Sequence, residues 1–292
     1  MKLLVSGARG QVGAALVALA GVEKVEVVGL DRSGLDIADK DAVFRVVEEH
    51  QPDIVVNAAA YTDVDRAEDE PELAFQVNRD GAKYVALACV AASIPLIHLS
   101  SDYVFDGRKS EPYSEDDLPN PLGVYGRSKW AGEEAIRAAL DRHIILRTSW
   151  VFSPRGSNFV HTILSLARER DELRVVSDQY GCPTPADDIA RALLVIAHKL
   201  VEVQNSWGVY HFAGLPPTTW FAFAQAIVDE ANLRGMSRVE SVTPISTSQY
   251  PTRALRPMSS VLATDKIEAT FGIREADWRG ALPGTISAIT SG

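Results

Sequence analysis

The chain has 292 residues, of which 46% are hydrophobic and 23% charged, and its formal net charge is −10. Its composition is that of a globular protein with a sizeable core, in one large domain or two modest ones. The negative charge, without clustered Lys and Arg, disfavours a nucleic-acid binder. Two cysteines outside metal or redox spacing, the lack of a signal-peptide pattern and the lack of a membrane-length apolar run predict a cytoplasmic protein.

Five short apolar runs in the first half predict strands that are buried on both faces of a parallel sheet. They cover 3–6, 25–30, 53–57, 94–100 and 143–148, and helical patterns lie between them at 39–50, 71–92 and 121–140. Strands and helices that take turns in this way imply right-handed crossovers. The first half therefore predicts a Rossmann-type doubly wound α/β fold.

Strand and helix patterns alternate less regularly in the second half, which predicts a smaller C-terminal lobe that closes over a ligand. Helical patterns cover 158–170, 187–199 and 219–232, and strand patterns cover 173–176 and 209–212. We divide the chain into a dinucleotide-binding domain, residues 1–150, and a mainly substrate-binding lobe, residues 151–292. Segments within 173–205 are expected to return to the first domain.

Three glycines, Gly7, Gly10 and Gly13, follow the first predicted strand and open a helix with the spacing G-x-x-G-x-x-G. A glycine triplet by itself also makes a tight turn, so the motif alone is weak. A strand before it and a helix after it favour a loop whose backbone N–H groups approach a pyrophosphate. We therefore predict a dinucleotide site here.

The cofactor preference depends on charges after the second strand. Asp31 ends this strand eighteen residues after Gly13, where a carboxylate can accept hydrogen bonds from an adenosine ribose and favours NAD. Arg32 and Arg9 can instead hold a 2′-phosphate, although Arg32 is about as well explained as a solvated surface charge. The balance predicts NADPH, with NADH also accepted.

The candidate catalytic residues are Ser101, where the fourth strand ends, and Tyr125 and Lys129, four apart near the start of a helix. A tyrosine with a pKa of about 10 donates protons poorly at neutral pH, and a nearby ammonium lowers that pKa. We predict that Tyr125 protonates a ketone oxygen, that Lys129 tunes it and holds a nicotinamide ribose, and that Ser101 bonds the carbonyl oxygen. A Tyr and a Lys four residues apart often occur by chance. Their position in the chain after the glycine loop and Ser101 favours a catalytic role.

These motifs resemble those of the extended short-chain dehydrogenase/reductase family, and longer strings are similar to those of its sugar-nucleotide ketoreductases. The strings lie at 57–65, 67–72, 101–107, 147–151, 178–184, 218–220, 250–252 and 256–257, so that nearly the whole chain is covered. The resemblance implies NAD(P)H-dependent reduction of a 4-keto sugar nucleotide, in a monomer or homodimer. It implies cofactor contacts from Gly10, Gln11, Val12, Asp36, Ile37, Ala60, Tyr61 and Thr62, and substrate contacts from Thr62, Ser101, Asp102 and Trp150.

One departure from the family concerns magnesium. Some relatives dimerise through magnesium held by carboxylates on the first helix and after the Pro-Thr motif. Here the first helix carries Ala14 and Ala15, and only Asp187 and Asp188 lie in the later segment. The six histidines also have no ligand spacing. We therefore expect no metal.

Three other functions compete with ketone reduction. A sugar-nucleotide dehydratase has Asp-Glu after the strand-end hydroxyl, whereas this chain has Asp102 and Tyr103, which disfavours dehydration. An epimerase needs little beyond the same Tyr-Lys pair and a retained NAD, so it stays open. A non-catalytic regulatory subunit that binds a nucleotide would not need Ser101, Tyr125 and Lys129, whose presence argues against it.

Overall fold

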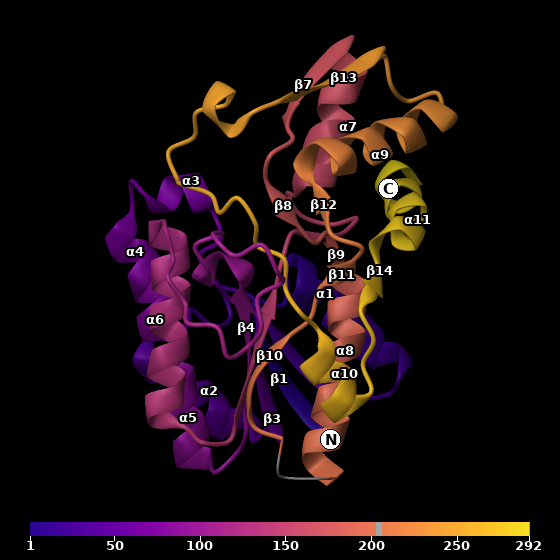
Figure 1. Ribbon diagram of the computed structural model, residues 1–292. Coiled ribbons are helices and arrows are strands. Elements are labelled where there is room, and N and C mark those ends of the chain that lie inside the picture. The colour runs from indigo at the N-terminus through magenta and orange to yellow at the C-terminus, as the bar shows by residue number, and fades with distance from the viewer. Residues whose placement is uncertain (203–205, 292) are drawn as a thin grey trace.

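Six parallel strands form the central sheet of the computed structural model, which describes residues 1–202 and 206–291 (Figure 1). They are β1 (Lys2–Ser6), β2 (Glu26–Leu30), β3 (Ile54–Asn57), β4 (Leu96–Ser101), β5 (His143–Thr148) and β10 (Gly208–His211). Their order is β2-β1-β3-β4-β5-β10. The predicted doubly wound α/β fold is confirmed; residues 203–205 and 292 of the predicted domains lie outside the described part.

Helices cover both faces of this sheet (Figure 1). Alternate strand residues point to opposite layers, so Leu3 and Val5 join one core while Leu4 joins the other. The first core lies under α1 (Gln11–Val22) and α8 (Ala186–Glu202), which pack against each other. The second lies under α2 (Lys40–His50), α5 (Ala82–Ala92) and α6 (Val124–Ala139). Helix α2 begins after Asp39, whose side chain accepts the Ala42 N–H at 3.1 Å.

The segment predicted as one helix over 71–92 is divided into three. A π-helix, Gln76–Gly81, separates α4 (Pro71–Phe75) from α5. Its wider turn places the buried Asn78 so that Oδ1 accepts the Tyr61 N–H at 2.8 Å and Nδ2 donates to Ser128 Oγ at 2.9 Å. Helical periodicity does not distinguish a π-turn from an α-turn. The π-turn ties the loop after β3 to helix α6.

The second lobe has a core of its own at the top of Figure 1. Strand β7 (Glu172–Val176) pairs in parallel with β13 (Ser241–Ile245), outside the central sheet. Helices α7 (Phe159–Glu169), α9 (Trp220–Leu233) and α11 (Trp278–Ser291) pack around Phe223 and Trp278. Strand β10 pairs with β5, and α8 packs on α1, so these elements lie with the sheet. The functional division at about residue 150 stays a prediction.

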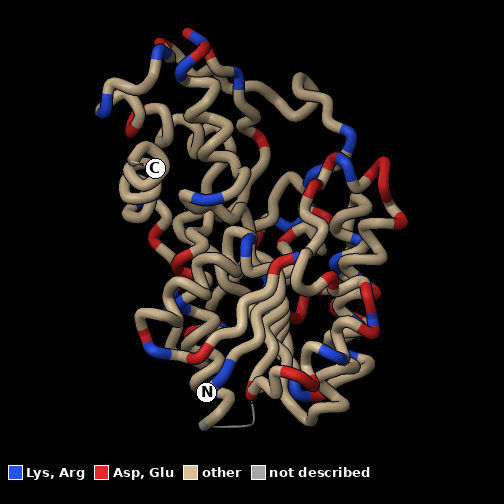
Figure 2. The backbone as a smooth tube through the Cα atoms, turned by 180° about the vertical axis from the view of Figure 1, so that it is seen from behind, with Lys and Arg blue, Asp and Glu red and all other residues tan. Residues whose placement is uncertain are grey.

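Short elements connect the two parts. The remaining ones are α3 (Val64–Ala67), α10 (Asp265–Phe271), the 3-10 turns Asp102–Val104 and Thr247–Gln249, and the strand pairs β6 (Val151–Phe152) with β9 (Thr184–Pro185), β8 (Tyr180–Gly181) with β12 (Thr218–Thr219), and β11 (Gly214–Leu215) with β14 (Ala276–Asp277). Acidic and basic positions are interspersed along the backbone seen from behind (Figure 2). Among the described residues, no helix has the length and apolarity that crossing a membrane requires.

Candidate active site

A cavity of about 940 Å³ lies at the carboxyl ends of the sheet strands, with walls from both parts of the molecule. Its lining includes the residues that follow β1, β2, β3, β4 and β5. The strand order reverses between β1 and β3, and ligands of open α/β sheets bind at such a reversal. The fold therefore builds a ligand site where the sequence places its motifs.

The cavity brings together every predicted site residue except one. Its lining includes Gly7, Gly10, Gln11, Val12, Asp31, Arg32, Asp36, Ile37, Ala60, Tyr61, Thr62, Ser101, Asp102, Tyr125, Lys129 and Trp150. Gly13 lies beneath, where a side chain would collide with the Gly7 carbonyl, so it allows helix α1 to pack on the loop. The individual roles stay predictions.

The glycine loop presents bare backbone to the cavity. Gly7 has φ +72°, and a Cβ on it would lie 2.7 Å from the Ala59 nitrogen. Gly10 is the N-cap of α1 and supplies no side-chain cap, so first-turn N–H groups can bind an anion. Gln11 Oε1 accepts bonds from Ser153 Oγ at 3.1 Å and Asn158 Nδ2 at 2.9 Å, which joins this helix to the second lobe.

Two exposed arginines border the cavity beside Asp31. Asp31 Oδ1 accepts bonds from the Ser33 N–H at 2.9 Å, the Ser33 hydroxyl at 2.6 Å and the Gly34 N–H at 3.1 Å. Its Oδ2 lies 2.8 Å from Arg9 Nε. The Ser33 hydroxyl, more than any other neighbour, holds the pKa of Asp31 below its usual value. The carboxylate is thus engaged in its own turn, while Arg9 and Arg32 extend into solvent.

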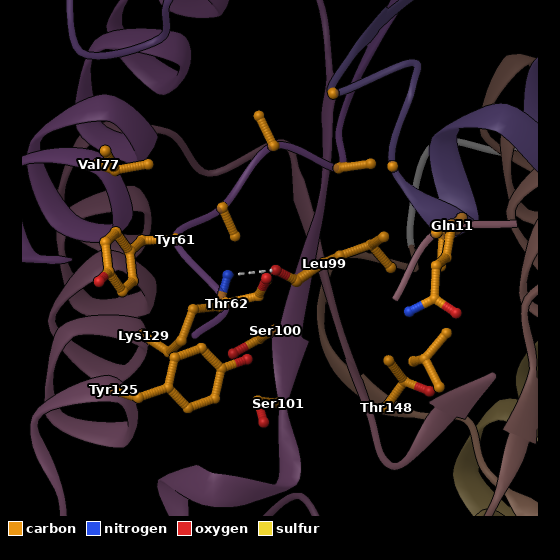
Figure 3. A pocket seen from close by; sticks show the side chains of 18 of the residues that line it. Gln11, Tyr61, Thr62, Val77, Leu99, Ser100, Ser101, Tyr125, Lys129 and Thr148 are labelled. Carbon is orange, nitrogen blue, oxygen red and sulfur yellow. Dashed lines mark hydrogen bonds between the residues drawn. The ribbon is translucent and has the colours of Figure 1, made fainter. Parts of the chain in front are cut away.

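Tyr125 and Lys129 project from α6 into the cavity beside Ser101 (Figure 3). Burial raises the pKa of Tyr125 to about 12, and the neighbouring Ser101 hydroxyl acts in the opposite direction. Burial also lowers the pKa of Lys129 to about 8, against the attraction of Glu133. Lys129 Nζ donates to the Leu99 carbonyl at 2.7 Å. The net effect on Tyr125 in this arrangement is a raised pKa, set mainly by burial. The expected tuning of Tyr125 by Lys129 stays a prediction.

Asp102 is buried at the same edge of the sheet, and only one of its two carboxyl oxygens has a hydrogen-bond partner among the described residues. Oδ1 accepts the Ser101 hydroxyl at 3.1 Å, whereas Oδ2 has no hydrogen-bond partner among the described residues. Burial raises the Asp102 pKa to about 7, although the nearby Ser260 and Ser101 hydroxyls act in the opposite direction. Buried polar atoms are nearly always paired, so an unpaired oxygen beside a cavity indicates a ligand group that completes it.

Trp150 forms a wall of the cavity in a strained backbone conformation, with φ 43°. Its ring stacks on Trp220 with centroids 3.4 Å apart and planes 7° apart. Gly181 of β8 also lies against this ring, because a Cβ on it would overlap the Trp150 side chain. Trp150 is thus fixed in place by α9 and β8.

Sequence reasoning missed about half of the cavity lining. The unpredicted residues are Ser33, Leu35, Ala58, Ala59, Val64, Val77, Leu99, Ser100, Tyr103, Thr148, Ser149, Val151, Gly156, Ser157, Asn158 and Trp220. Trp220 carried a signal, because the string 218–220 is part of the family resemblance. Seven others, Ala58, Ala59, Val64, Tyr103, Thr148, Ser149 and Val151, also lie within such strings. The rest lie near predicted residues, except Val77, which comes from the π-helix, and Gly156, Ser157 and Asn158, which come from the second lobe without a motif.

The carboxylates considered for magnesium start helix α8, where Asp188 pairs with Arg191. Within residues 1–202 and 206–291, no group of three or more His, Cys, Asp and Glu side chains is placed to hold a metal ion.

Comparison with known proteins identifies the family of this chain. The model of the family described as RmlD substrate binding domain matches residues 1–291. The dTDP-4-dehydrorhamnose reductase of Aggregatibacter actinomycetemcomitans is 46% identical over 284 residues, which cover 96% of this chain and 97% of that protein.

Two crystal structures of similar proteins point to the same family. A dTDP-4-dehydrorhamnose reductase from Clostridium acetobutylicum is 36% identical with a TM-score of 0.91, over 99% of this chain and 100% of that one. The Bacillus anthracis dTDP-4-dehydrorhamnose reductase in complex with NADP is 35% identical with a TM-score of 0.90, over 98% of each chain. The resemblance predicted from the sequence is confirmed: the chain belongs to the RmlD family, together with these dTDP-4-dehydrorhamnose reductases.

Proposed function

We propose that this chain reduces the 4-keto group of dTDP-4-dehydro-L-rhamnose to give dTDP-L-rhamnose, with NADPH as reductant and Tyr125 as proton donor. The observation that carries the proposal is the meeting of Tyr125, Lys129 and Ser101 in one cavity with the glycine loop. The names of the relatives support the substrate. We also propose that the protein acts in the cytoplasm, as a monomer or homodimer, without magnesium.

The cavity fits a nicotinamide dinucleotide. The uncapped start of α1 and the side-chain-free Gly7 and Gly10 would hold the pyrophosphate. Arg9 and Arg32 would hold a 2′-phosphate, which favours NADPH, in agreement with the relative solved with NADP. NADH would bind without that contact. When bound, the reduced nicotinamide supplies the hydride.

Tyr125 would supply the proton. Its high pKa keeps the phenol protonated at neutral pH, as a donor must be at the start of a reduction. As the ketone oxygen gains negative charge, its affinity for the phenol proton rises. Ser101, beside Tyr125, would turn its hydroxyl hydrogen from Asp102 to the same oxygen. Lys129 would hold the nicotinamide ribose and stabilise the phenolate left on Tyr125.

The sugar nucleotide would occupy the part of the cavity between Asp102 and Trp150. The unpaired Oδ2 of Asp102 would accept a sugar hydroxyl, and the Trp150 side chain, which lines the cavity, would pack against the ligand. Thr62 lies in the loop after β3 and would contact both ligands. Buried polar groups that find their partners only in the correct ligand give selectivity.

The test is an assay with dTDP-4-keto-6-deoxy-L-mannose and NADPH, in which the absorbance of the reduced cofactor is followed. We expect oxidation by the parent protein and a loss of roughly 10²–10⁴-fold in rate, about 3–5 kcal/mol, for Tyr125→Phe. Lys129→Met should lower the rate and weaken cofactor binding. Tyr84→Phe, outside the cavity on α5, is the matched control and should resemble the parent.

Absence of cofactor oxidation, with Tyr125→Phe indistinguishable from the parent, would contradict the reductase. Running the assay with NADH and with several keto-sugar nucleotides also separates the alternatives. An epimerase would interconvert the sugars without net oxidation of added cofactor, and a regulatory subunit would bind nucleotide without turnover.

A further inference from the structure

A line of buried polar side chains crosses the sheet and ends at Lys129. Ser6 on β1 is in register with Asn57 on β3, and Asn57 is in register with His98 on β4. Lys129 reaches the end of this line from α6, with Nζ 3.4 Å from His98 Nε2. The exposure of each of the four residues is 2% or less. Only Lys129 of the four lines the cavity, so the line supports it from behind.

The direction of each hydrogen bond in the line is fixed by a backbone group. The Ala59 N–H, which can only donate, lies 3.2 Å from Asn57 Oδ1 and identifies that atom as the amide oxygen. The Ser6 hydroxyl donates to the same oxygen at 2.7 Å. The amide nitrogen Nδ2 therefore faces His98 Nδ1 at 3.1 Å and donates to it. His98 Nδ1 must accept, and so it carries no hydrogen.

The neutral imidazole of His98 then carries its hydrogen on Nε2, the atom that faces Lys129. An ammonium has three N–H donors and no lone pair, so two donors meet unless Lys129 has lost a proton. The separation of 3.4 Å is longer than the 2.7–3.2 Å typical of N–H hydrogen bonds. Leu99, at 2.7 Å, is the acceptor that Lys129 does have (Figure 3).

We propose that His98 is a positioning residue that weakens the hold of Lys129 on its proton, through the Nε2–H that Ser6 and Asn57 orient. The inference rests on the proposed function in that Lys129 serves Tyr125 and the cofactor. Lys129 passes between ammonium and amine near neutral pH, and its charge is lost at a lower pH than that of a surface lysine. The pKa of Lys129, lowered to about 8 mainly by burial, has the direction that this geometry requires.

Other ionisable groups face this pair from the packed elements. Glu133, one turn further along α6, raises the Lys129 pKa, but it is bonded to Arg147 of β5 at 2.6 Å. His143, also on β5, faces His98 and has its own pKa lowered by burial. Burial lowers the pKa of His98 well below its ordinary value, so the ring is neutral. Among the described residues, none of these groups accepts a hydrogen bond from Lys129, whose acceptor is the Leu99 carbonyl.

The experiment reverses the direction of the line. In Asn57→Asp, a carboxylate replaces the donor, so His98 must carry its hydrogen on Nδ1 and Nε2 becomes an acceptor for the ammonium. The titration of Lys129 is followed by NMR of the full chain with ¹³C-labelled lysine, and its signal is assigned by its loss in Lys129→Met. We expect the midpoint to move upward by roughly one pH unit or more. The alkaline limb of the reductase rate should move in the same direction.

Two variants act as controls. In His98→Gln, the amide oxygen can accept from Asn57 while the amide nitrogen still presents N–H to Lys129, so the midpoint should stay at the parent value. His143→Gln replaces another buried histidine and should also leave it unchanged. The proposal is overturned if Asn57→Asp leaves the midpoint in place or lowers it, or if His98→Gln moves it as far as Asn57→Asp does.

The unmodified protein provides a second test, which holds even if Asn57→Asp does not fold. Long-range ¹H–¹⁵N NMR reports which ring nitrogen of His98 carries hydrogen. Hydrogen on Nε2 between pH 6 and 9 supports the proposal, and hydrogen on Nδ1 overturns it. Both NMR measurements are independent of turnover, so a failed reductase assay contradicts the proposed function without deciding the role of His98.

Discussion

The guanidinium of Arg9 lies 2.8 Å from the carboxylate of Asp31, at the edge of the cavity where an adenosine ribose would bind. The carboxylate already accepts three hydrogen bonds from its own turn. Asp31 is therefore a poorer partner for ribose hydroxyls than its position in the sequence indicates. Arg9, 85% of whose side chain is exposed, can turn toward a 2′-phosphate.

We predict that Arg9→Ala and Arg32→Ala each raise the KM for NADPH by roughly 10- to 100-fold, because a hydrogen bond to a charged group contributes about 1.5–3 kcal/mol. The KM for NADH should change little, since NADH lacks the phosphate. Steady-state kinetics with both cofactors measure the effect. Arg168→Ala, an exposed arginine outside the cavity, is the control. An equal loss with NADH would contradict the assignment.

The ion pair between Glu133 and Arg147 gives a prediction about stability. Both side chains are fully buried, with bonds of 2.9 and 2.6 Å between them, and Ser100 Oγ donates to the same carboxylate at 2.5 Å. Arg147→Met leaves the carboxylate buried without its cation and should lower the free energy of unfolding by roughly 3–5 kcal/mol. Urea unfolding of the single variants and of Glu133→Leu with Arg147→Met should show strong coupling.

The exposed pair Arg137 and Glu134, 3.3 Å apart on the same helix, is the matched control. Its double-mutant cycle should give less than about 1 kcal/mol, because water screens both charges. Similar coupling energies for the two cycles would mean that burial does not determine the strength of the Glu133 pair.

Gly181 tests the role of Trp150. In Gly181→Ala the new methyl group overlaps the Trp150 ring, which must move out of its stack with Trp220. If Trp150 contacts the sugar nucleotide, the KM for that substrate should rise roughly tenfold, about 1.4 kcal/mol, while the KM for NADPH stays the same. Gly284→Ala, with open space at its Cβ, should match the parent. A change confined to the cofactor KM would refute this role.

The sheet and the glycine loop were predictable because their signals are local. Strands buried on both faces appear as apolar runs, and Gly7 to Gly13 follow the first of them directly. The prediction was wrong for β2, which is partly exposed because it lies at the edge of the sheet. The π-turn at Asn78 was not predictable, since a segment of six residues is too short to show a period of its own.

The site was predictable only where a motif marks it. Tyr125, Lys129 and Ser101 carry recognisable spacing, whereas Asn158 reaches the cavity from the second lobe without a motif. Ser6, Asn57 and His98 become neighbours only through the strand register, which depends on long-range pairing. The raised pKa of Tyr125 was missed because desolvation depends on burial, which spacing does not reveal.

The final prediction concerns Asp102 and pH. Burial raises the pKa of its carboxyl to about 7 from an ordinary value of 3.8. Between these two pH values the folded state binds a proton that the unfolded state does not, so Asp102 makes stability fall as pH rises; above about pH 7 its effect is constant. Asp102→Asn removes this penalty. Relative to the parent, the variant should gain up to roughly 4 kcal/mol between pH 4 and 7 and nothing further at pH 8. Urea unfolding at pH 5, 6, 7 and 8 measures the difference.

Asp106→Asn is the control. Burial of Asp106 is outweighed by the hydrogen bonds that its carboxylate accepts from the Arg108 backbone, Asn120 and Tyr113, so its pKa is lowered. The difference in stability between Asp106→Asn and the parent should therefore be flat over this pH range. A flat difference for Asp102→Asn as well would show that the Asp102 carboxyl ionises normally in the folded protein.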